Sequence, residues 1–214
     1  ETRTGALACA GLIERDAILR ELDGLPIRTC TEERRPDEPA LFPRILGRRF
    51  DALPEPVRAV HGAPAGTRPS GRAVARAGRH PLARLMARVM GLRPGGRHAA
   101  RVALEPAGPG ERWTRRFGTA RFTSILRDAG DYGRFEERIG PLRFRFRAAA
   151  EAGALVWQPE GWSLLGLPLP PSLAPRVRAR SWAAEGRYRF RVAVAHPWTG
   201  LDFAYRGSLE PDRE

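Results

Sequence analysis

The chain has 214 residues, enough for one domain with an appendage or for two small domains, and its 42% hydrophobic content argues against a disordered protein. Arginine supplies all 37 basic residues, and the formal net charge of +13 gives the surface a positive field. The two cysteines, Cys9 and Cys30, form no disulfide framework and lack metal-ligand spacing, so we expect a cytoplasmic protein with no metal site and no cofactor.

The first 40 residues differ in charge from the rest of the chain. Residues 1–40 hold 6 arginines and 9 acidic residues, whereas the remainder holds 31 arginines and 15 acidic residues. Apolar residues recur at helical spacing over residues 7–22, and the charged, proline-bearing residues 31–39 are typical of a linker. We therefore interpret residues 1–38 as the helical tail of an upstream domain plus a linker, and residues 39–214 as a separate domain.

Helices are expected first in this domain. A proline begins each of three short segments whose apolar residues recur at helical spacing, residues 39–50, 54–61 and 81–90. The third has the clearest amphipathic pattern, with apolar residues at i, i+3, i+4, i+7 and i+8 from Leu82 to Met90. We expect this apolar face to pack against the core and the helix to cover one end of the sheet.

After Gly96 the pattern is nearly all strand. Short alternating segments are separated by turns rich in Gly, Pro or Asp, which is typical of an antiparallel meander. The expected strands are residues 72–76, 97–105, 111–117, 120–127, 132–139, 142–148, 154–159, 162–165, 176–183, 187–195 and 201–209. So many short strands form a barrel or a strongly curved sheet, because a flat sheet would leave unpaired edges. The predicted fold class is therefore α+β, with N-terminal helices packed on a curved antiparallel sheet or barrel.

Arginine alternates with apolar residues most regularly in a hairpin predicted over residues 175–196. The candidate anion-binding side chains are Arg176, Arg178, Arg180, Arg187, Arg189 and Arg191. A period of two places them on one face and aromatic residues such as Tyr188 on the other. Bases cannot then stack beside the arginines, which argues against nucleic acid as a partner. A solvated face and an anionic surface or acidic partner are the alternatives, because like charges repel across a hairpin.

Several short motifs of the second domain occur together in one bacterial family. They are Leu41-Phe42-x-x-Ile45-Leu46-Gly47-x-x-Phe50, Leu53-Pro54-x-x-Val57-Arg58-x-x-His61, Glu111-Arg112-Trp113-x-Arg115-x-Phe117, Arg138-x-Gly140-Pro141-Leu142-x-Phe144 and Leu164-Leu165-Gly166-Leu167-Pro168-Leu169-Pro170. Through them, residues 41–210 resemble DUF4166, a domain of unknown function often found C-terminal to oxidoreductases similar to saccharopine dehydrogenase or to short-chain dehydrogenases. The resemblance implies an accessory module attached to an upstream oxidoreductase domain, and it brings no established catalytic residues.

Large aromatic side chains are spread over the predicted strands, where they either fill the interior of a barrel or line a cavity. The candidate ligand-binding residues are Trp113, Arg116, Phe144, Trp157, Trp162, Trp182 and Tyr188. Residues 162–171 are apolar and stiffened by proline, so an exposed position would make them a portal flap, a membrane-touching lip or a docking surface. The segment is too short and too rich in proline to span a membrane.

The sequence carries no nucleophile elbow, phosphate loop or paired acid and base. The adjacent Glu136 and Glu137 would face opposite sides of a strand. The leading hypothesis is an accessory module that holds an apolar or amphipathic small molecule in a barrel cavity and works with an oxidoreductase. One alternative is a small enzyme with a cavity site at His61, Trp113 and Arg116, in which His61 acts as a base or ligand. The other is an anion or nucleic-acid binder that uses the arginine-lined strands.

Overall fold

The computed structural model describes residues 39–89 and 95–211. All of them belong to the second of the two units into which the chain divides, Glu33–Glu214. The helical tail and linker predicted for residues 1–38 lie outside the described residues.

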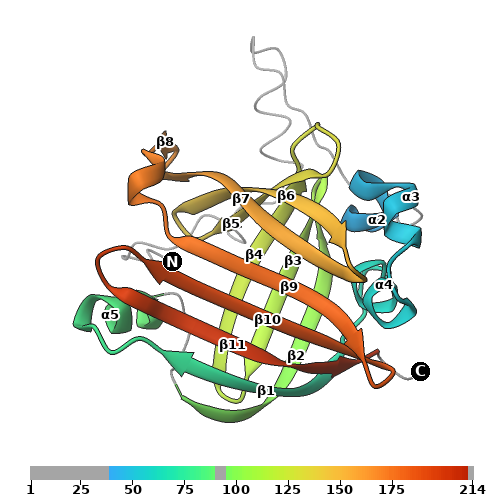
Figure 1. The fold of residues 1–214 in the computed structure, drawn as a ribbon, viewed down its shortest axis with the longest axis horizontal. Coiled ribbons are helices and arrows are strands. Elements are labelled where there is room, and N and C mark those ends of the chain that lie inside the picture. Colours follow the sequence, from blue (N-terminus) through green and yellow to red (C-terminus); the bar gives the residue numbers. More distant parts are fainter. Residues whose placement is uncertain (1–38, 90–94, 212–214) are drawn as a thin grey trace, which may run out of the picture. The chain divides into compact units, whose positions relative to one another are not determined.

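The domain is a closed antiparallel β-barrel (Figure 1). Its strands are β1 (Ser70–Ala77), β2 (Gly96–Ala107), β3 (Gly110–Phe117), β4 (Ala120–Asp128), β5 (Arg134–Ile139), β6 (Leu142–Glu151), β7 (Ala154–Leu164), β9 (Arg176–Ala184), β10 (Arg187–His196) and β11 (Gly200–Glu210). They follow the order β6-β5-β4-β3-β2-β1-β11-β10-β9-β7, and an additional pairing of β6 with β7 closes the ring. The short β8 (Leu167–Pro168) pairs only with the end of β7. The predicted antiparallel barrel is thus confirmed, although the described part of the chain is mostly β.

Alternation along each strand explains why these segments form a barrel with an apolar interior. In β6 the side chains of Phe144 and Phe146 are buried, whereas those of Arg143, Arg145 and Arg147 are exposed. A strand that hides every second side chain from water must have one face inside the barrel and one outside. The outer arginines are ion-paired with glutamates of neighbouring strands, as in the 3.0 Å contact between Arg145 Nε and a carboxylate oxygen of β5.

Residues 154–159 and 162–165, predicted as two strands, form the single strand β7. The register with β6 shifts by one residue, because Arg145 pairs with Gly161 and Phe146 pairs with Pro159. Glu160 is therefore the extra residue of a β-bulge, which accommodates the proline that cannot donate to the ladder. Its carboxylate accepts hydrogen bonds from Arg134 and Arg147, which hold its pKa below the usual range. The local Pro-Glu-Gly sequence signals a turn, but the strand continues through it.

The helices lie at the two ends of the barrel (Figure 1). At one end are α2 (Leu41–Leu46), α3 (Arg48–Asp51) and α4 (Glu55–His61), and at the other is α5 (Pro81–Val89). The helix predicted over residues 39–50 is divided at Gly47, whose φ of +50° lies in the left-handed region that favours glycine. The side chain of Tyr132 ties the strands to this end, because its hydroxyl donates to the carbonyl oxygen of Leu46 at 2.6 Å.

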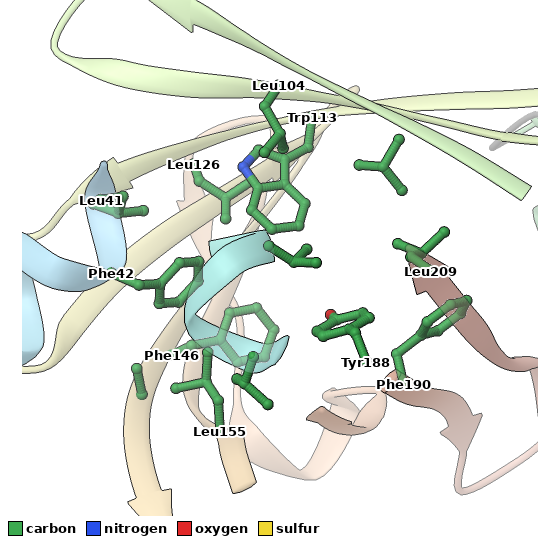
Figure 2. Close-up of a cluster of buried hydrophobic side chains, with 14 of the residues drawn as sticks. Leu41, Phe42, Leu104, Trp113, Leu126, Phe146, Leu155, Tyr188, Phe190 and Leu209 are labelled. Atoms are coloured by element: carbon green, nitrogen blue, oxygen red, sulfur yellow. The ribbon is translucent and has the colours of Figure 1, made fainter. Parts of the chain in front are cut away.

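The packed core lies where α2 and α4 meet the barrel interior (Figure 2). Phe42 is fully buried, and its ring lies 5.4 Å from that of Phe135 and 5.7 Å from that of Trp157. Glu111 fastens α2 to the barrel, because its carboxylate accepts hydrogen bonds from the Leu41 backbone N–H and the Trp113 indole N–H, at 2.6 and 2.9 Å. The helices therefore close this end of the barrel with side chains.

Across residues 39–89 and 95–211, none of the helices has the length and apolar character needed to cross a membrane.

Candidate functional site

The barrel holds a cavity of about 560 Å³ between its closed helical end and the end that carries α5. Most of its wall is aromatic or aliphatic, and polar residues line it both at the helical end, as His61 and Ser181 do, and beside Trp198, as His196, Thr199 and Asp202 do. Leu82 and Trp198 line the cavity at the opposite end, which we call the mouth. The volume falls within the range of roughly 300–1,000 Å³ that small-molecule sites occupy. An apolar cavity with a few convergent polar groups is the usual form of such a site.

A buried charged pair lies on the cavity wall. Arg115 projects inward from β3 and Glu137 from β5, and Arg115 Nη2 lies 3.4 Å from a carboxylate oxygen of Glu137. Arg115 Nη1 donates to the Ser124 hydroxyl at 2.7 Å. Its guanidinium also lies 4.8 Å from the ring centre of Phe122 and 5.1 Å from that of Trp113. Among the described residues, only two of the five N–H groups of Arg115 have hydrogen-bond acceptors, so the side chain can bind a further polar group.

A second polar cluster lies at the helical end of the cavity. His61 ends α4, and its Nε2 atom lies 3.0 Å from the Ser181 hydroxyl of β9 and 3.1 Å from the Tyr188 hydroxyl of β10. His61 Nδ1 is buried and has no hydrogen-bond partner within the described parts of the chain. A buried N–H without an acceptor is costly, which favours the tautomer with its proton on Nε2. In this tautomer the Nε2–H of His61 donates to one of the two hydroxyls. The hydroxyl protons of Ser181 and Tyr188 can then be donated to other acceptors.

Burial shifts the ionisation of these groups strongly. Desolvation, followed by the nearby charge of Arg115, lowers the pKa of His61 to about 3. Burial raises the pKa of Tyr188 well above its usual range, and that of Tyr205 to about 12. All three side chains are therefore neutral near pH 7. The arrangement can donate and accept hydrogen bonds, but a histidine with so low a pKa is a weak general base.

The structure brings most of the predicted cavity residues together. Those that line the cavity are His61, Trp113, Phe144, Trp157, Trp162 and Tyr188. Arg116 and Trp182 do not join them. Arg116 is exposed on the outer face of β3, because it is one position away from the inward Arg115. Trp182 likewise points outward from β9, where it lies beside Arg180, with 5.9 Å between the guanidinium and the ring centre.

The predicted arginine ladder lies on the outer wall, opposite the cavity. Arg187 and Arg189 are ion-paired, with Glu210 at 3.8 Å and Glu185 at 2.7 Å. Within the described ranges, no ion pair is formed by Arg176, Arg178, Arg180 or Arg191. Arg180 and Arg191 face each other across β9 and β10, and Arg206 of β11 continues the row. The outer wall is therefore positively charged. Of the ladder arginines only Arg180 also lines the cavity in the described part of the chain.

Sequence reasoning missed the inward polar residues Arg115, Glu137 and Ser181 of the cavity wall, and Ser124, which accepts a hydrogen bond from Arg115. A signal for Arg115 is present in the sequence, because the motif Trp113-x-Arg115-x-Phe117 places the arginine on the same strand face as two aromatic residues. The prediction that Glu136 and Glu137 face opposite sides is confirmed, because Glu136 is bound by outer arginines. No local sequence pattern indicates that Ser124 and Ser181 point into the barrel.

Comparison with known proteins gives a family and no activity. No curated protein matches the chain. A solved structure of a protein with unknown function from the DUF3598 family of Nostoc punctiforme is similar at 13% sequence identity and a TM-score of 0.42. The match covers 69% of this chain but only 47% of that one, so this chain spans less than half of the longer protein. The family model of DUF4166, a domain of unknown function, matches residues 53–209. This match covers most of the chain and confirms the resemblance seen in the sequence motifs, so the protein belongs to the DUF4166 family.

Proposed function

We propose that the barrel binds an apolar or amphipathic small molecule in its cavity. The observation that carries the proposal is the apolar cavity of about 560 Å³ with buried hydrogen-bonding groups near one end. Burial of an alkyl or ring system there would contribute about 0.8 kcal/mol for each CH₂ group removed from water. The free energy of binding such a ligand is most favourable where the wall is aromatic, as it is around Trp157 and Phe144.

The polar end of the ligand would lie between the two polar clusters. Arg115 has N–H groups without described acceptors, and the hydroxyls of Ser181 and Tyr188 can donate or accept. A carbonyl, hydroxyl or carboxylate at one end of the ligand satisfies these groups, and its apolar part extends toward the mouth. This orientation leaves no unpaired polar group of the ligand in apolar surroundings.

Filling the cavity from its wall is expected to weaken binding at least about tenfold. Ala179 of β9 is buried, lines the cavity and pairs with Trp157 across the ladder, so Ala179→Phe adds a ring to the space. The measurement is titration with dansyl-labelled undecanoic acid, a fluorescent probe that has an alkyl chain and a carboxylate. Ala193→Phe is the matched control, because Ala193 pairs with the outward Arg178 on the outer wall. Equal affinity of both variants and the wild type would contradict a site in the cavity.

The natural ligand can be identified by native mass spectrometry of the purified protein, followed by organic extraction. A stoichiometric apolar or amphipathic molecule that the Ala179→Phe variant no longer carries supports the proposal. A wild-type protein that is empty as purified and also fails to bind the dansyl probe refutes it.

A reaction at the helical end of the cavity is the second candidate function. The observation that favours it is the 3.0 Å contact between the Ser181 hydroxyl and His61 Nε2, which would activate the serine as a nucleophile in the tautomer that leaves Nε2 without a proton, whereas the tautomer favoured by the buried Nδ1 carries its proton there. The low pKa of His61 argues against it, because the imidazole attracts a proton weakly near pH 7. Hydrolysis of a p-nitrophenyl ester that is lost in both Ser181→Ala and His61→Gln would favour catalysis over binding alone.

We further propose that this module works with an oxidoreductase in the cytoplasm, as the family resemblance implies. A cavity that can hold an apolar molecule would suit the storage or delivery of a substrate for such an enzyme. Co-purification of a dehydrogenase with the tagged protein would support the association.

A further inference from the structure

Exposed apolar side chains surround the mouth of the cavity. They are Leu82, Leu85, Leu165, Leu167, Trp198 and Leu201, here called the apolar rim. Leu165, Leu167 and Trp198 are 78%, 70% and 72% exposed, and several such side chains at one end of the domain, unlike a single one, indicate an interaction surface. Leu82 and Trp198 line the mouth itself. Figure 1 shows α5, β8 and the β10–β11 turn at this end of the barrel, away from α2–α4.

Separate segments of the chain are held together to form the rim. The backbone N–H of Leu165, in the β7–β8 turn, donates to the carbonyl oxygen of Pro141 in the β5–β6 turn at 2.9 Å. Gly78, just before α5, donates to the carbonyl oxygen of Asp202 in β11 at 2.7 Å. A side chain at Gly78 would meet both the Leu201 backbone and Ala83 of α5. The apolar rim is therefore supported by backbone contacts and is not a single loop.

Helix α5 does not bury the two leucines that its sequence pattern places on the apolar face. Its small residues Ala83 and Ala87 are buried, at 0% and 1% exposed, whereas Leu82 and Leu85 are about half exposed. The predicted apolar face of leucines is thus not packed in the core, which corrects the expectation for this part of the helix. Burial of leucine is more favourable than burial of alanine, so this orientation leaves apolar area for a partner outside the domain.

The surface beside the apolar rim is cationic. Arg84 and Arg88 are exposed on α5, and the exposed Arg79 lies two residues before the helix begins. None of these three arginines forms an ion pair in the described portion of the chain. An amphipathic helix with exposed leucines and arginines, next to an exposed tryptophan, matches the chemistry of an anionic lipid surface, whose headgroups are negative and whose interior is apolar.

We propose that the mouth of the barrel docks on an anionic lipid surface. The apolar rim inserts at the boundary between headgroups and acyl chains, and Arg79, Arg84 and Arg88 lie against the phosphates. Docking in this orientation opens the cavity toward the bilayer. The consequence that a ligand passes between the bilayer and the cavity rests on the proposed function, whereas the docking itself does not.

The test is co-sedimentation of the full chain with phosphatidylcholine vesicles that contain or lack phosphatidylglycerol. We expect salt-sensitive binding to the phosphatidylglycerol vesicles, weakened about tenfold or more in the variant Leu165→Asp/Leu167→Asp. The matched control is Ala52→Asp/Ala65→Asp, which introduces the same charge at exposed residues near the helical end of the barrel. No binding of the wild type to anionic vesicles, or equal losses in both variants, overturns the proposal.

A second pair of variants separates the apolar rim from the outer wall. Arg84→Gln/Arg88→Gln is expected to weaken vesicle binding, and Arg180→Gln/Arg191→Gln is expected to leave it unchanged. The reverse result assigns lipid binding to the arginine ladder of the wall and overturns docking by the mouth. A wild-type dimer that Leu165→Asp/Leu167→Asp converts to a monomer overturns it as well, because a second copy then covers the apolar rim.

Binding of the dansyl probe without vesicles distinguishes this proposal from the cavity site. We expect Leu165→Asp/Leu167→Asp to bind the probe like the wild type, since both leucines are largely exposed. Vesicle binding by a protein that never binds the probe would refute the cavity ligand and leave the docking surface intact.

Discussion

Replacing Glu137 with alanine is expected to lower the free energy of unfolding by about 3–5 kcal/mol. The carboxylate lies 3.4 Å from Arg115 Nη2, and both side chains are buried inside the barrel. Arginine side chains do not lose their proton in proteins, so Arg115 would keep a buried charge with only the neutral Ser124 hydroxyl as a described hydrogen-bond partner. Urea unfolding followed by tryptophan fluorescence measures the change.

The neighbouring Glu136 provides the control for this prediction. Its carboxylate lies on the outer wall, 3.0 Å from Arg145 and 3.5 Å from Arg143, both of which are more than half exposed. Exposed ion pairs contribute little, so Glu136→Ala is expected to change the free energy of unfolding by no more than about 1 kcal/mol. Equal losses from the two alanine variants would contradict a dependence of the fold on the buried pair.

Removing both buried charges is expected to lower the free energy of unfolding less than removing one of them. The variant Arg115→Met/Glu137→Leu replaces the pair with apolar side chains of similar size, and no unpaired charge is left behind. Its stability should therefore lie closer to the wild type than that of Glu137→Ala. The same variant would lose affinity for a ligand whose polar end binds Arg115, which separates the structural and binding roles of the pair.

Most of the fold could be predicted from local sequence patterns. Period-two alternation, as in Arg143 to Arg147, located the strands within a few residues of their positions and indicated which side faces inward. The number of predicted strands also indicated a barrel or a strongly curved sheet, and the pairing of β6 with β7 closes the ring. The bulge at Glu160 was missed because a Pro-Glu-Gly sequence signals a turn as strongly as it signals a bulge.

The candidate site was harder to predict because it depends on contacts between distant residues. His61 and Ser181 are 120 positions apart, and only closure of the barrel brings them within 3.0 Å. The choice of Arg116 over Arg115 was an error of one position, which in a strand reverses the face of the sheet. The orientation of α5 could not be read from its periodicity, because an apolar stripe identifies a face that needs a partner without saying which partner covers it.

Acidification is expected to destabilise the wild type through His61 in a way that a His61→Gln variant lacks. The pKa of His61 is about 3 in the folded protein, whereas a solvated histidine of the unfolded chain has its ordinary pKa of 6.5. Between these values the unfolded chain binds one more proton than the folded one, so stability is lost as pH falls. The slope is about 1.4 kcal/mol per pH unit, or about 3 kcal/mol between pH 6 and pH 4. Above pH 7 the two proteins should show no difference in pH dependence from this group.

Comparison of the two proteins isolates this effect from the protonation of carboxylates, which both share. Glutamine keeps a hydrogen-bonding side chain near Ser181 and Tyr188 but cannot take up a proton. The measured quantity is the difference between the unfolding free energies of wild type and variant in urea at pH 7, 6, 5 and 4. A difference that stays constant over this range would mean that His61 is not held neutral by burial, because the lost stability is the thermodynamic counterpart of its lowered pKa. Because His61 of the folded protein stays neutral down to a pH of about 3, ligand binding to the folded barrel should not change through this group between pH 7 and pH 4, although the stability does.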